Sequence, residues 1–281
     1  MKVFQQQKST QQQKQADDTE SVLMQESKTD HLKERQEGKL LNKVALITGG
    51  DSGLGRAVAI AFAKEGADIV ITYSNNSQDA EQTKELVEKE GRSCLAIAGN
   101  VMNEEFCQQA VQQTIDRFQK LDILVNNAVQ EHPQETEDTS TEQLERDLDT
   151  SICSMFYMTD AAVPYLKEGS IIINTTSVAA YKDSQQVVDH PASKGAIMTF
   201  TRSSSQSLEE KGIRVNGITP GPVWTLQVPS TSPTNKVKEF DNQLPKGPVI
   251  DPEAIAPSFV YLASDESSYM AGQILFSQTR F

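Results

Sequence analysis

The chain lacks the features that mark nucleic-acid-binding, disulfide-bonded and membrane-spanning proteins. It has 26 Lys and Arg against 39 Asp and Glu, a formal charge of −13, which disfavours the basic surface that nucleic acids require. Its three cysteines, Cys94, Cys107 and Cys153, fit neither a disulfide framework nor a zinc site and favour a reducing compartment. No apolar run approaches the roughly 20 residues of a spanning helix, and the N-terminus lacks a secretory-signal pattern. We therefore expect a cytoplasmic protein with no nucleic-acid or membrane partner.

The first 40 residues differ in composition from the rest of the chain. Seven of the first twenty residues are Gln, and apolar residues are sparse after Phe4. Such a segment buries too little surface to offset its ordering entropy. The composition predicts a flexible polar tail over residues 1–40, followed by one domain over residues 41–281.

From Lys43 onward, short apolar segments alternate with longer amphipathic ones. The expected strands are 44–47, 68–72, 93–98, 121–126, 170–175, 213–218 and 273–276. The expected helices begin near Gly53 and then cover 103–118, 141–147, 150–166, 192–211 and 252–263. Right-handed crossovers then predict an α/β fold, a single doubly wound Rossmann-type domain with an approximately seven-stranded parallel sheet and helices on both faces. Ligands in such sheets bind beyond the carboxyl ends of the strands.

The most informative segment runs from Lys43 to Tyr73 and forms one expected strand–helix–strand unit. Its first turn reads Thr48-Gly49-Gly50-Asp51-Ser52-Gly53-Leu54-Gly55. Glycines at that place allow a tight turn, let the backbone approach a diphosphate and let the helix pack closely on its strand. The alternative is a turn that is merely rich in glycine, and the position between strand and helix favours the phosphate-binding interpretation.

Several motifs occur in the order and at the separations of a known family. They are Thr48-Gly49-X3-Gly53-X-Gly55, Asn126-Asn127-Ala128, Ser177, Lys194 and Pro220-Gly221-Pro222. Over about residues 40–276 the chain resembles the classical branch of the short-chain dehydrogenase/reductase superfamily. The stretches GGDSGLGRAVAIAFAKEGA, INTTSVAAY and ASDESSYMAGQ further resemble its bacterial stress-associated, glucose-dehydrogenase-like members. The resemblance implies an NAD(P)-dependent oxidoreductase that moves a hydride between nicotinamide and an alcohol or carbonyl substrate, such as a sugar, polyol or aldehyde.

The resemblance also implies where a coenzyme would bind. The residues concerned are Gly49, Ser52, Gly53, Leu54 and Gly55 around the diphosphate; Tyr73 at the end of the second strand; Asn100 and Val101 at the adenine; Asn126 and Ala128 beneath the ribose; Lys194 at the nicotinamide ribose; and Pro220, Gly221, Val223 and Thr225 near the nicotinamide. The stretch 220–248, rich in Pro, Thr and Ser, becomes a mobile lid over the substrate.

The end of the second expected strand bears on the choice between NAD and NADP. Tyr73-Ser74-Asn75 offers no carboxylate for the ribose 2′-hydroxyl, so nothing evident repels a 2′-phosphate. Arg56, Ser74 and Asn75 could contact that phosphate, which slightly favours NADP. The alternative is that Arg56 only caps a solvated helix face.

Two of the four catalytic positions that the resemblance implies depart from the family pattern. Ser177 and Lys194 are present, but His190 stands where the family has Tyr and Ser151 where it has Asn. Imidazole is a competent acid or base near neutral pH. Beside Lys194 and an oxidised nicotinamide it should stay mostly neutral, which suits a base in alcohol oxidation better than an acid in carbonyl reduction. The alternatives are a catalytically impaired dinucleotide-binding protein, acting through binding or assembly, and a structural subunit of a mixed oligomer.

The sequence also bears on metal binding, on assembly and on the kind of substrate. The three histidines lie far apart in sequence, so we expect no catalytic metal. The resemblance implies a homo-oligomer, a dimer or a tetramer, formed through the helices 150–166 and 192–211. The substrate is expected to be a small molecule whose identity the sequence does not specify.

Overall fold

The computed structural model describes residues 38–128, 152–176, 189–221 and 251–277, with only the backbone described for residues 189–194. All of these residues belong to one unit, Glu37–Phe281. The predicted tail lies outside the described residues except for its last three, Gly38 to Leu40. The expected helix 141–147 and the expected lid from residue 222 onward also lie outside them.

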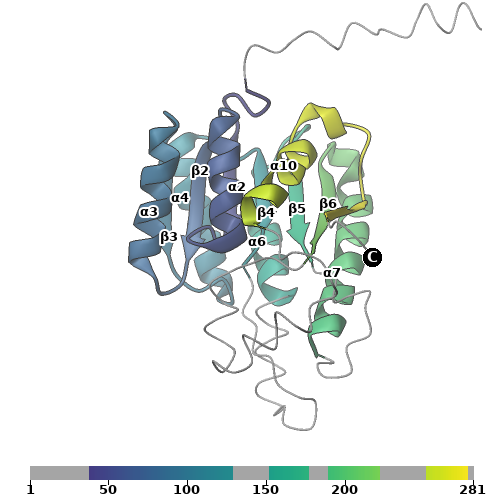
Figure 1. Cartoon of the computed structure of the whole chain (residues 1–281). Coiled ribbons are helices and arrows are strands. Elements are labelled where there is room, and N and C mark those ends of the chain that lie inside the picture. The colour runs from purple at the N-terminus through teal and green to yellow at the C-terminus, as the bar shows by residue number, and fades with distance from the viewer. Residues whose placement is uncertain (1–37, 129–151, 177–188, 222–250, 278–281) are drawn as a thin grey trace, which may run out of the picture. The chain divides into compact units, whose positions relative to one another are not determined.

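Within the described residues, seven strands form one sheet, and every neighbouring pair is parallel (Figure 1). Across the sheet the order is β3-β2-β1-β4-β5-β6-β7. The strands are β1 Val44–Thr48, β2 Asp68–Tyr73, β3 Cys94–Ala98, β4 Ile123–Asn126, β5 Ile171–Thr175, β6 Arg214–Pro220 and β7 Ile274–Ser277. The chain proceeds from β1 in one direction to β3 and then returns to add β4 on the other side of β1. This order confirms the predicted doubly wound α/β fold.

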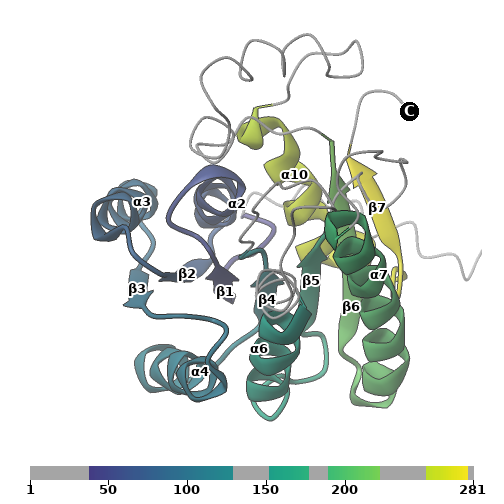
Figure 2. The same cartoon turned by 90° about the horizontal axis from the view of Figure 1, so that it is seen from below.

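Helices cover both faces of the sheet, as Figure 2 shows from below. Helices α2, α3 and α10 lie on one face, and α4, α6 and α7 lie on the other. The helices are α2 Gly53–Lys64, α3 Ser77–Lys89, α4 Glu104–Phe118, α6 Ser154–Ala162, α7 Asp189–Leu208 and α10 Pro252–Ala263, with 3₁₀ turns η5 Glu209–Lys211 and η6 Asp265–Ser267. The crossover helices therefore cover both faces of the parallel sheet, the first two on one face, the next three on the other and α10 on the first face again.

Helices α3, α6 and α7 differ from the sequence-based expectation, and α6 ends at Ala162, four residues before the expected end. Helix α3 is absent from the predicted set because its sequence is strongly polar and only Ala80, Thr83 and Val87 are buried. A stripe of three positions gives a weak periodic signal. Helix α7 begins at Asp189, three residues before the expected start, with Pro191 in its first turn. Proline is tolerated there because first-turn N–H groups have no partner within the helix.

Each face of the sheet buries its own apolar cluster. On one side Phe62 of α2 and Phe259 of α10 are fully buried against isoleucines of the sheet. Leu40, just before the first strand, is fully buried in the same cluster. On the other side Met158 of α6 and Leu208 of α7 pack with α4 and the sheet. The two clusters stabilise the sheet from both sides, and because all neighbouring strands are parallel their carboxyl ends lie at one edge.

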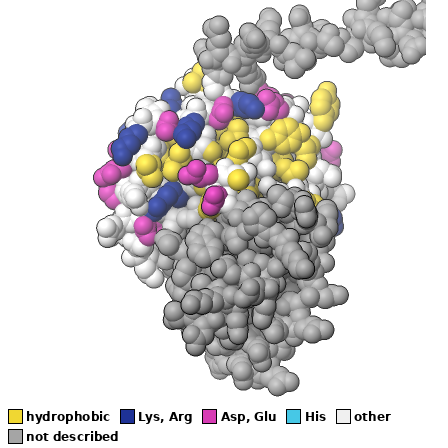
Figure 3. Space-filling view, in the orientation of Figure 1, with side chains coloured by type: hydrophobic (Ala, Val, Ile, Leu, Met, Phe, Trp, Pro, Cys, Tyr) yellow, Lys and Arg dark blue, Asp and Glu magenta, His cyan; other side chains and the backbone are white. Residues whose placement is uncertain are grey.

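The surface over α2 and α3 is polar and carries charges of both signs. Figure 3 shows Lys and Arg side chains interspersed with Asp and Glu on the face drawn there. Hydrophobic side chains gather toward α10, where Tyr261 and, beyond the helix, Tyr269 are exposed. On α6, Phe156 is 56% exposed and its ring lies 6.2 Å from that of Phe200 on α7. Met155, Met158 and Ile197 of these two helices are buried in the chain's own interior.

Candidate coenzyme site

The glycine-rich turn joins β1 to α2 through two positions that only glycine suits. Gly49 has φ +63°, and a Cβ atom there would lie 3.1 Å from the Cα of Ala128. A Cβ atom on Gly55 would lie 2.0 Å from the carbonyl oxygen of Gly49 and 2.8 Å from Asn127 Nδ2. The first turn of α2 therefore lies directly against the turn that precedes it, with no room for a side chain between them.

The first turn of α2 suits an anion. Its N-cap residue, Ser52, has an extended conformation and makes no side-chain capping hydrogen bond, and no acidic residue lies in the first turn. The N–H groups of a first helical turn have no partner within the helix, and they add to the positive end of the helix dipole. Together with the glycine contacts, this arrangement fits the diphosphate of a dinucleotide.

Asn127 and Thr48 connect the glycine turn to the end of β4. The Asn127 side-chain amide donates to the carbonyl oxygens of Thr48 and Gly49, at 3.1 and 3.3 Å. The Thr48 hydroxyl oxygen accepts from the backbone N–H groups of Asn127 and Ala128, both at 2.9 Å. Strand order reverses between β1 and β4, so these bonds join the two sides of the crevice where ligands of such sheets bind. The sequence motif contained Asn127, but its role depends on a contact across about 80 residues and was not predicted.

Asn126 is buried rather than open to the crevice. Its amide donates to Thr159 Oγ1 of α6 at 3.1 Å and to Asn174 Oδ1 of β5 at 2.9 Å, and it is 1% exposed. Asn174 in turn donates to Thr201 Oγ1 of α7 at 3.0 Å. This buried polar chain ties α6 and α7 to the centre of the sheet. Asn126 is thus a buried part of the framework next to the expected ribose position, and its side chain is bonded to α6 and β5.

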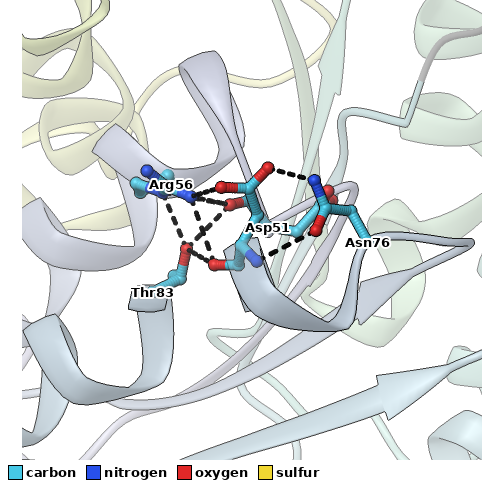
Figure 4. Close-up of polar contacts among 5 residues, drawn as sticks. Asp51, Arg56, Asn76 and Thr83 are labelled. Carbon is cyan, nitrogen blue, oxygen red and sulfur yellow. Dashed lines mark hydrogen bonds and ion pairs between the residues drawn. The ribbon is translucent and has the colours of Figure 1, made fainter. Parts of the chain in front are cut away.

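Arg56, in the first turn of α2, is held within the protein (Figure 4). Its guanidinium donates to the carbonyl oxygen of Asp51 and forms an ion pair of 3.0 Å with Asp79 of α3. It also donates to Thr83 Oγ1 at 2.9 Å. Of the two interpretations of Arg56, a solvated cap does not describe these contacts, because its side chain is only 20% exposed.

Other predicted coenzyme residues lie along the same carboxyl edge of the sheet. Tyr73 ends β2 and its carbonyl accepts from Gly99 N–H at 2.8 Å, next to Asn100 and Val101, which follow β3. Pro220 ends β6, and Gly221 N–H donates to Ser277 at 2.9 Å. The structure thus brings the described members of the predicted site to one edge.

The predicted catalytic residues are only partly covered. Ser151, Ser177, Val223 and Thr225 lie outside the described residues, as does the expected lid. His190 and Lys194 lie in the first turns of α7, four residues apart and hence on one helix face, and their side chains are not described. Thr176, which precedes Ser177, is buried, and its N–H donates to Ile218 at 2.8 Å.

Burial raises the pKa of the Asp51 carboxyl, and the nearby Asp79 carboxylate adds to the shift. The folded protein therefore binds a proton at Asp51 more tightly than the unfolded chain does. The stability of the fold falls as the pH rises from the unfolded-state pKa of Asp51 through its higher folded-state pKa. We expect Asp51→Asn to raise the melting temperature at pH 7. The gain should vanish as the pH falls below the ordinary value of 3.8. Thermal melts across pH check this, with Asp116→Asn on the exposed side of α4 as the control; a lower melting temperature at pH 7 would contradict it.

The thiols of the half-buried Cys94 and the buried Cys107 are poor nucleophiles. Burial raises the pKa of both Cys94 and Cys107 to about 12.

Among the described residues, no group of three His, Cys, Asp or Glu is placed to hold a metal ion. The described helices are all too short or too polar to cross a membrane.

Comparison with known proteins identifies close relatives. The family model described as Enoyl-(Acyl carrier protein) reductase matches residues 49–278. The chain is 55% identical over 242 residues to "Uncharacterized oxidoreductase YhdF" of Bacillus subtilis (strain 168), covering 86% of this chain and 84% of the relative. It is 44% identical over 244 residues to "Glucose and ribitol dehydrogenase" of Daucus carota, covering 84% of each.

Solved structures with the same fold include coenzyme complexes. A short-chain dehydrogenase from Burkholderia cenocepacia J2315 in complex with NADP has a TM-score of 0.79 at 26% identity, covering 86% of this chain and 98% of that one. A short chain dehydrogenase from Mycobacterium paratuberculosis bound to NAD has a TM-score of 0.76 at 30% identity, covering 85% and 97%.

Proposed function

Because this chain belongs to the short-chain dehydrogenase/reductase family of oxidoreductases, we propose that it moves a hydride between NAD(P) and an alcohol or carbonyl group of a small sugar, polyol or aldehyde. The observation that carries the proposal is the turn between β1 and α2, where a Cβ atom on Gly55 would meet the Gly49 carbonyl at 2.0 Å. That turn fits a diphosphate, and Asn127 fastens it across the crevice.

The coenzyme, when bound, supplies or accepts the hydride. On this proposal the turn from Gly49 to Gly55 holds the diphosphate, and Asn100 and Val101 hold the adenine. Ala128 lies beneath the ribose, which Lys194 also binds. Gly221, Val223 and Thr225 bind near the nicotinamide.

The proton chemistry is assigned to residues at the start of α7 and after β5. Ser177 orients and polarises the substrate oxygen, and His190 gains or loses the proton in place of a tyrosine. Lys194 lies one helical turn from His190, and on this proposal it binds the ribose and tunes the neighbouring acid. Ser151 stands where a water-anchoring Asn is expected. A neutral imidazole accepts a proton more readily than it donates one, so alcohol oxidation is the favoured direction.

A second candidate function follows from the same positions. With His190 and Ser151 both departing from the family pattern, the chain could bind a dinucleotide and act through binding or assembly, with little turnover. A subunit lending structure to a mixed oligomer is the third possibility. Coenzyme binding separates the third from the first two, and turnover separates the first from the second.

Coenzyme choice is proposed to favour NADP slightly. The segment Tyr73-Ser74-Asn75 ends β2 without a carboxylate, and Ser74 and Asn75 can donate to a 2′-phosphate. A solved relative in this family carries NADP and another carries NAD, so both coenzymes occur within the same fold.

Coenzyme titration followed by a substrate screen tests the proposed function. We expect NADPH and NADH to bind with dissociation constants in the micromolar range, about −8 kcal/mol, measured by coenzyme fluorescence. Sugars, polyols and aldehydes are then screened across pH for coenzyme oxidation or reduction. Binding without turnover of any substrate would leave the dinucleotide-binding alternative, and loss of binding would leave the structural one.

Assembly and location stay proposals. The exposed Phe156 beside Phe200 supports a homo-oligomer formed through α6 and α7, a dimer or a tetramer. We also propose a cytoplasmic location and a separate N-terminal tail, which ends before residue 38 rather than at residue 40 because Leu40 is fully buried in the core of the domain.

A further inference from the structure

Three hydrogen-bond donors converge on one backbone carbonyl in the glycine turn. The Asp51 carbonyl oxygen accepts from Arg56 Nε at 3.0 Å, from Arg56 Nη2 at 2.6 Å and from Thr83 Oγ1 at 2.9 Å. This carbonyl precedes the N-cap of α2, so its orientation is set by side chains and not by the helix itself. Two of the three donors belong to a single planar guanidinium, which fixes direction as well as distance.

The guanidinium is itself anchored to the start of α3. Arg56 Nη2 contacts Asp79 Oδ1 at 3.0 Å, and the other carboxylate oxygen of Asp79 accepts from the Asn76 side-chain amide. Asn76 is the N-cap of α3 and accepts from the Asp79 backbone N–H at 3.2 Å. Because the Arg56 charge is already paired with Asp79, it is poorly placed to serve as the main contact of a 2′-phosphate.

Fixing the Asp51 carbonyl also fixes the next amide. The described peptide bonds contain no cis bond, so the Asp51–Ser52 peptide is trans and planar. In a trans peptide the C=O and the N–H point in opposite directions. The Ser52 N–H therefore points away from Arg56 and Thr83, on the other side of the turn.

We propose that Arg56 is a positioning residue of the coenzyme site, which holds the Asp51–Ser52 peptide so that the Ser52 N–H faces the diphosphate. The proposal rests on the proposed function, since it concerns the coenzyme turn. The diphosphate is common to NADH and NADPH, so Arg56 contributes equally to the binding of both. A residue that read the 2′-phosphate would instead favour NADPH alone.

The test compares the affinities of both coenzymes for Arg56 variants without any turnover. We expect Arg56→Gln to raise both dissociation constants about tenfold and to leave their ratio unchanged within about twofold. Arg56→Lys should weaken the binding of both coenzymes less, about threefold. An ammonium group can still donate a hydrogen bond to the Asp51 carbonyl, but it lacks the two donors that the planar guanidinium directs at that oxygen. Thr83→Val, which removes the third donor, should also weaken both about threefold.

Arg92→Gln is the matched control. Arg92 forms an ion pair of 2.9 Å with Asp68, and the two side chains are 22% and 24% exposed, against 20% and 24% for Arg56 and Asp79. This pair lies at the amino ends of β2 and β3, away from the coenzyme edge. We expect Arg92→Gln to lower the melting temperature about as much as Arg56→Gln and to leave both affinities unchanged.

Two outcomes overturn the inference. Selective loss of NADPH in Arg56→Gln would make Arg56 a phosphate-reading residue, and unchanged affinities in a folded Arg56→Gln protein would make its role purely structural. Affinities measured well below each melting temperature report on binding by folded protein alone. If Arg56→Gln does not fold, the affinities of Thr83→Val for both coenzymes test whether the bonds to the Asp51 carbonyl matter for binding. If the wild-type protein binds neither coenzyme, the proposed function falls as well.

Discussion

Gly55→Ala is expected to weaken the binding of both coenzymes at least a hundredfold, or about 2.8 kcal/mol. The added methyl carbon would lie 2.0 Å from the Gly49 carbonyl oxygen and 2.8 Å from the Gly49 carbonyl carbon. Both are backbone atoms, so the first turn of α2 must move away from the glycine turn. That movement would displace the N–H groups that hold the diphosphate under the proposed function. Coenzyme fluorescence titration measures the effect.

Gly195→Ala provides the matched control for this change. Gly195 lies in α7, and a Cβ atom there would meet no atom of the described residues within 4 Å. Alanine is favoured over glycine in a helix by about 1 kcal/mol, so this variant should be slightly more stable and should bind coenzyme normally. Normal binding by a folded Gly55→Ala protein would show that the turn tolerates the displacement and is not the diphosphate site.

His190→Tyr is expected to raise kcat/KM for carbonyl reduction at least tenfold, about 1.4 kcal/mol of transition-state stabilisation. A phenol beside Lys194 reaches farther than an imidazole and donates a proton where a neutral imidazole donates poorly. The gain should be larger in reduction than in oxidation, because His190 already suits the role of base. Steady-state kinetics in both directions, with the best substrate from the screen, measure the change.

Ser151→Asn, combined with His190→Tyr, extends this test. Restoring the amide should add to the gain if Ser151 occupies the water-anchoring position. His190→Phe keeps the ring and removes the proton-transfer group, so it should lose activity while coenzyme affinity stays near that of the wild type. No gain in kcat/KM from His190→Tyr would mean that the cause of the reduced activity lies elsewhere in the chain.

Strong local patterns made most of the fold predictable. Each strand of the sheet is a short apolar run, and β1 with its glycine turn and α2 occurs within twenty-one residues, Val44 to Lys64. Interactions within such a segment depend on near neighbours, so composition and spacing suffice to recognise them. Helix α3 was not predicted because it buries only a narrow stripe of residues and its sequence resembles a polar loop.

In the candidate site, too, features set by near neighbours were predictable and contacts between distant segments were not. Gly49, Gly53 and Gly55 could be predicted because a turn of this kind needs glycine whatever surrounds it. The roles of Arg56 and Asn127 could not, because their partners, Asp79 and the Thr48 and Gly49 carbonyls, lie 23 and about 80 residues away. The bonds of the Asn126 amide to Thr159 and Asn174 were not predicted either, because these partners lie 33 and 48 residues away.

For this protein, then, amino-acid order alone is enough to predict the strands, most of the helices, the parallel arrangement and a glycine turn between the first strand and its helix. Only the packed molecule decides which side chains hold that turn in place. The reason is physical: hydrophobic periodicity and glycine geometry are local properties of the chain, whereas a hydrogen bond between distant segments exists only after the sheet has brought them together.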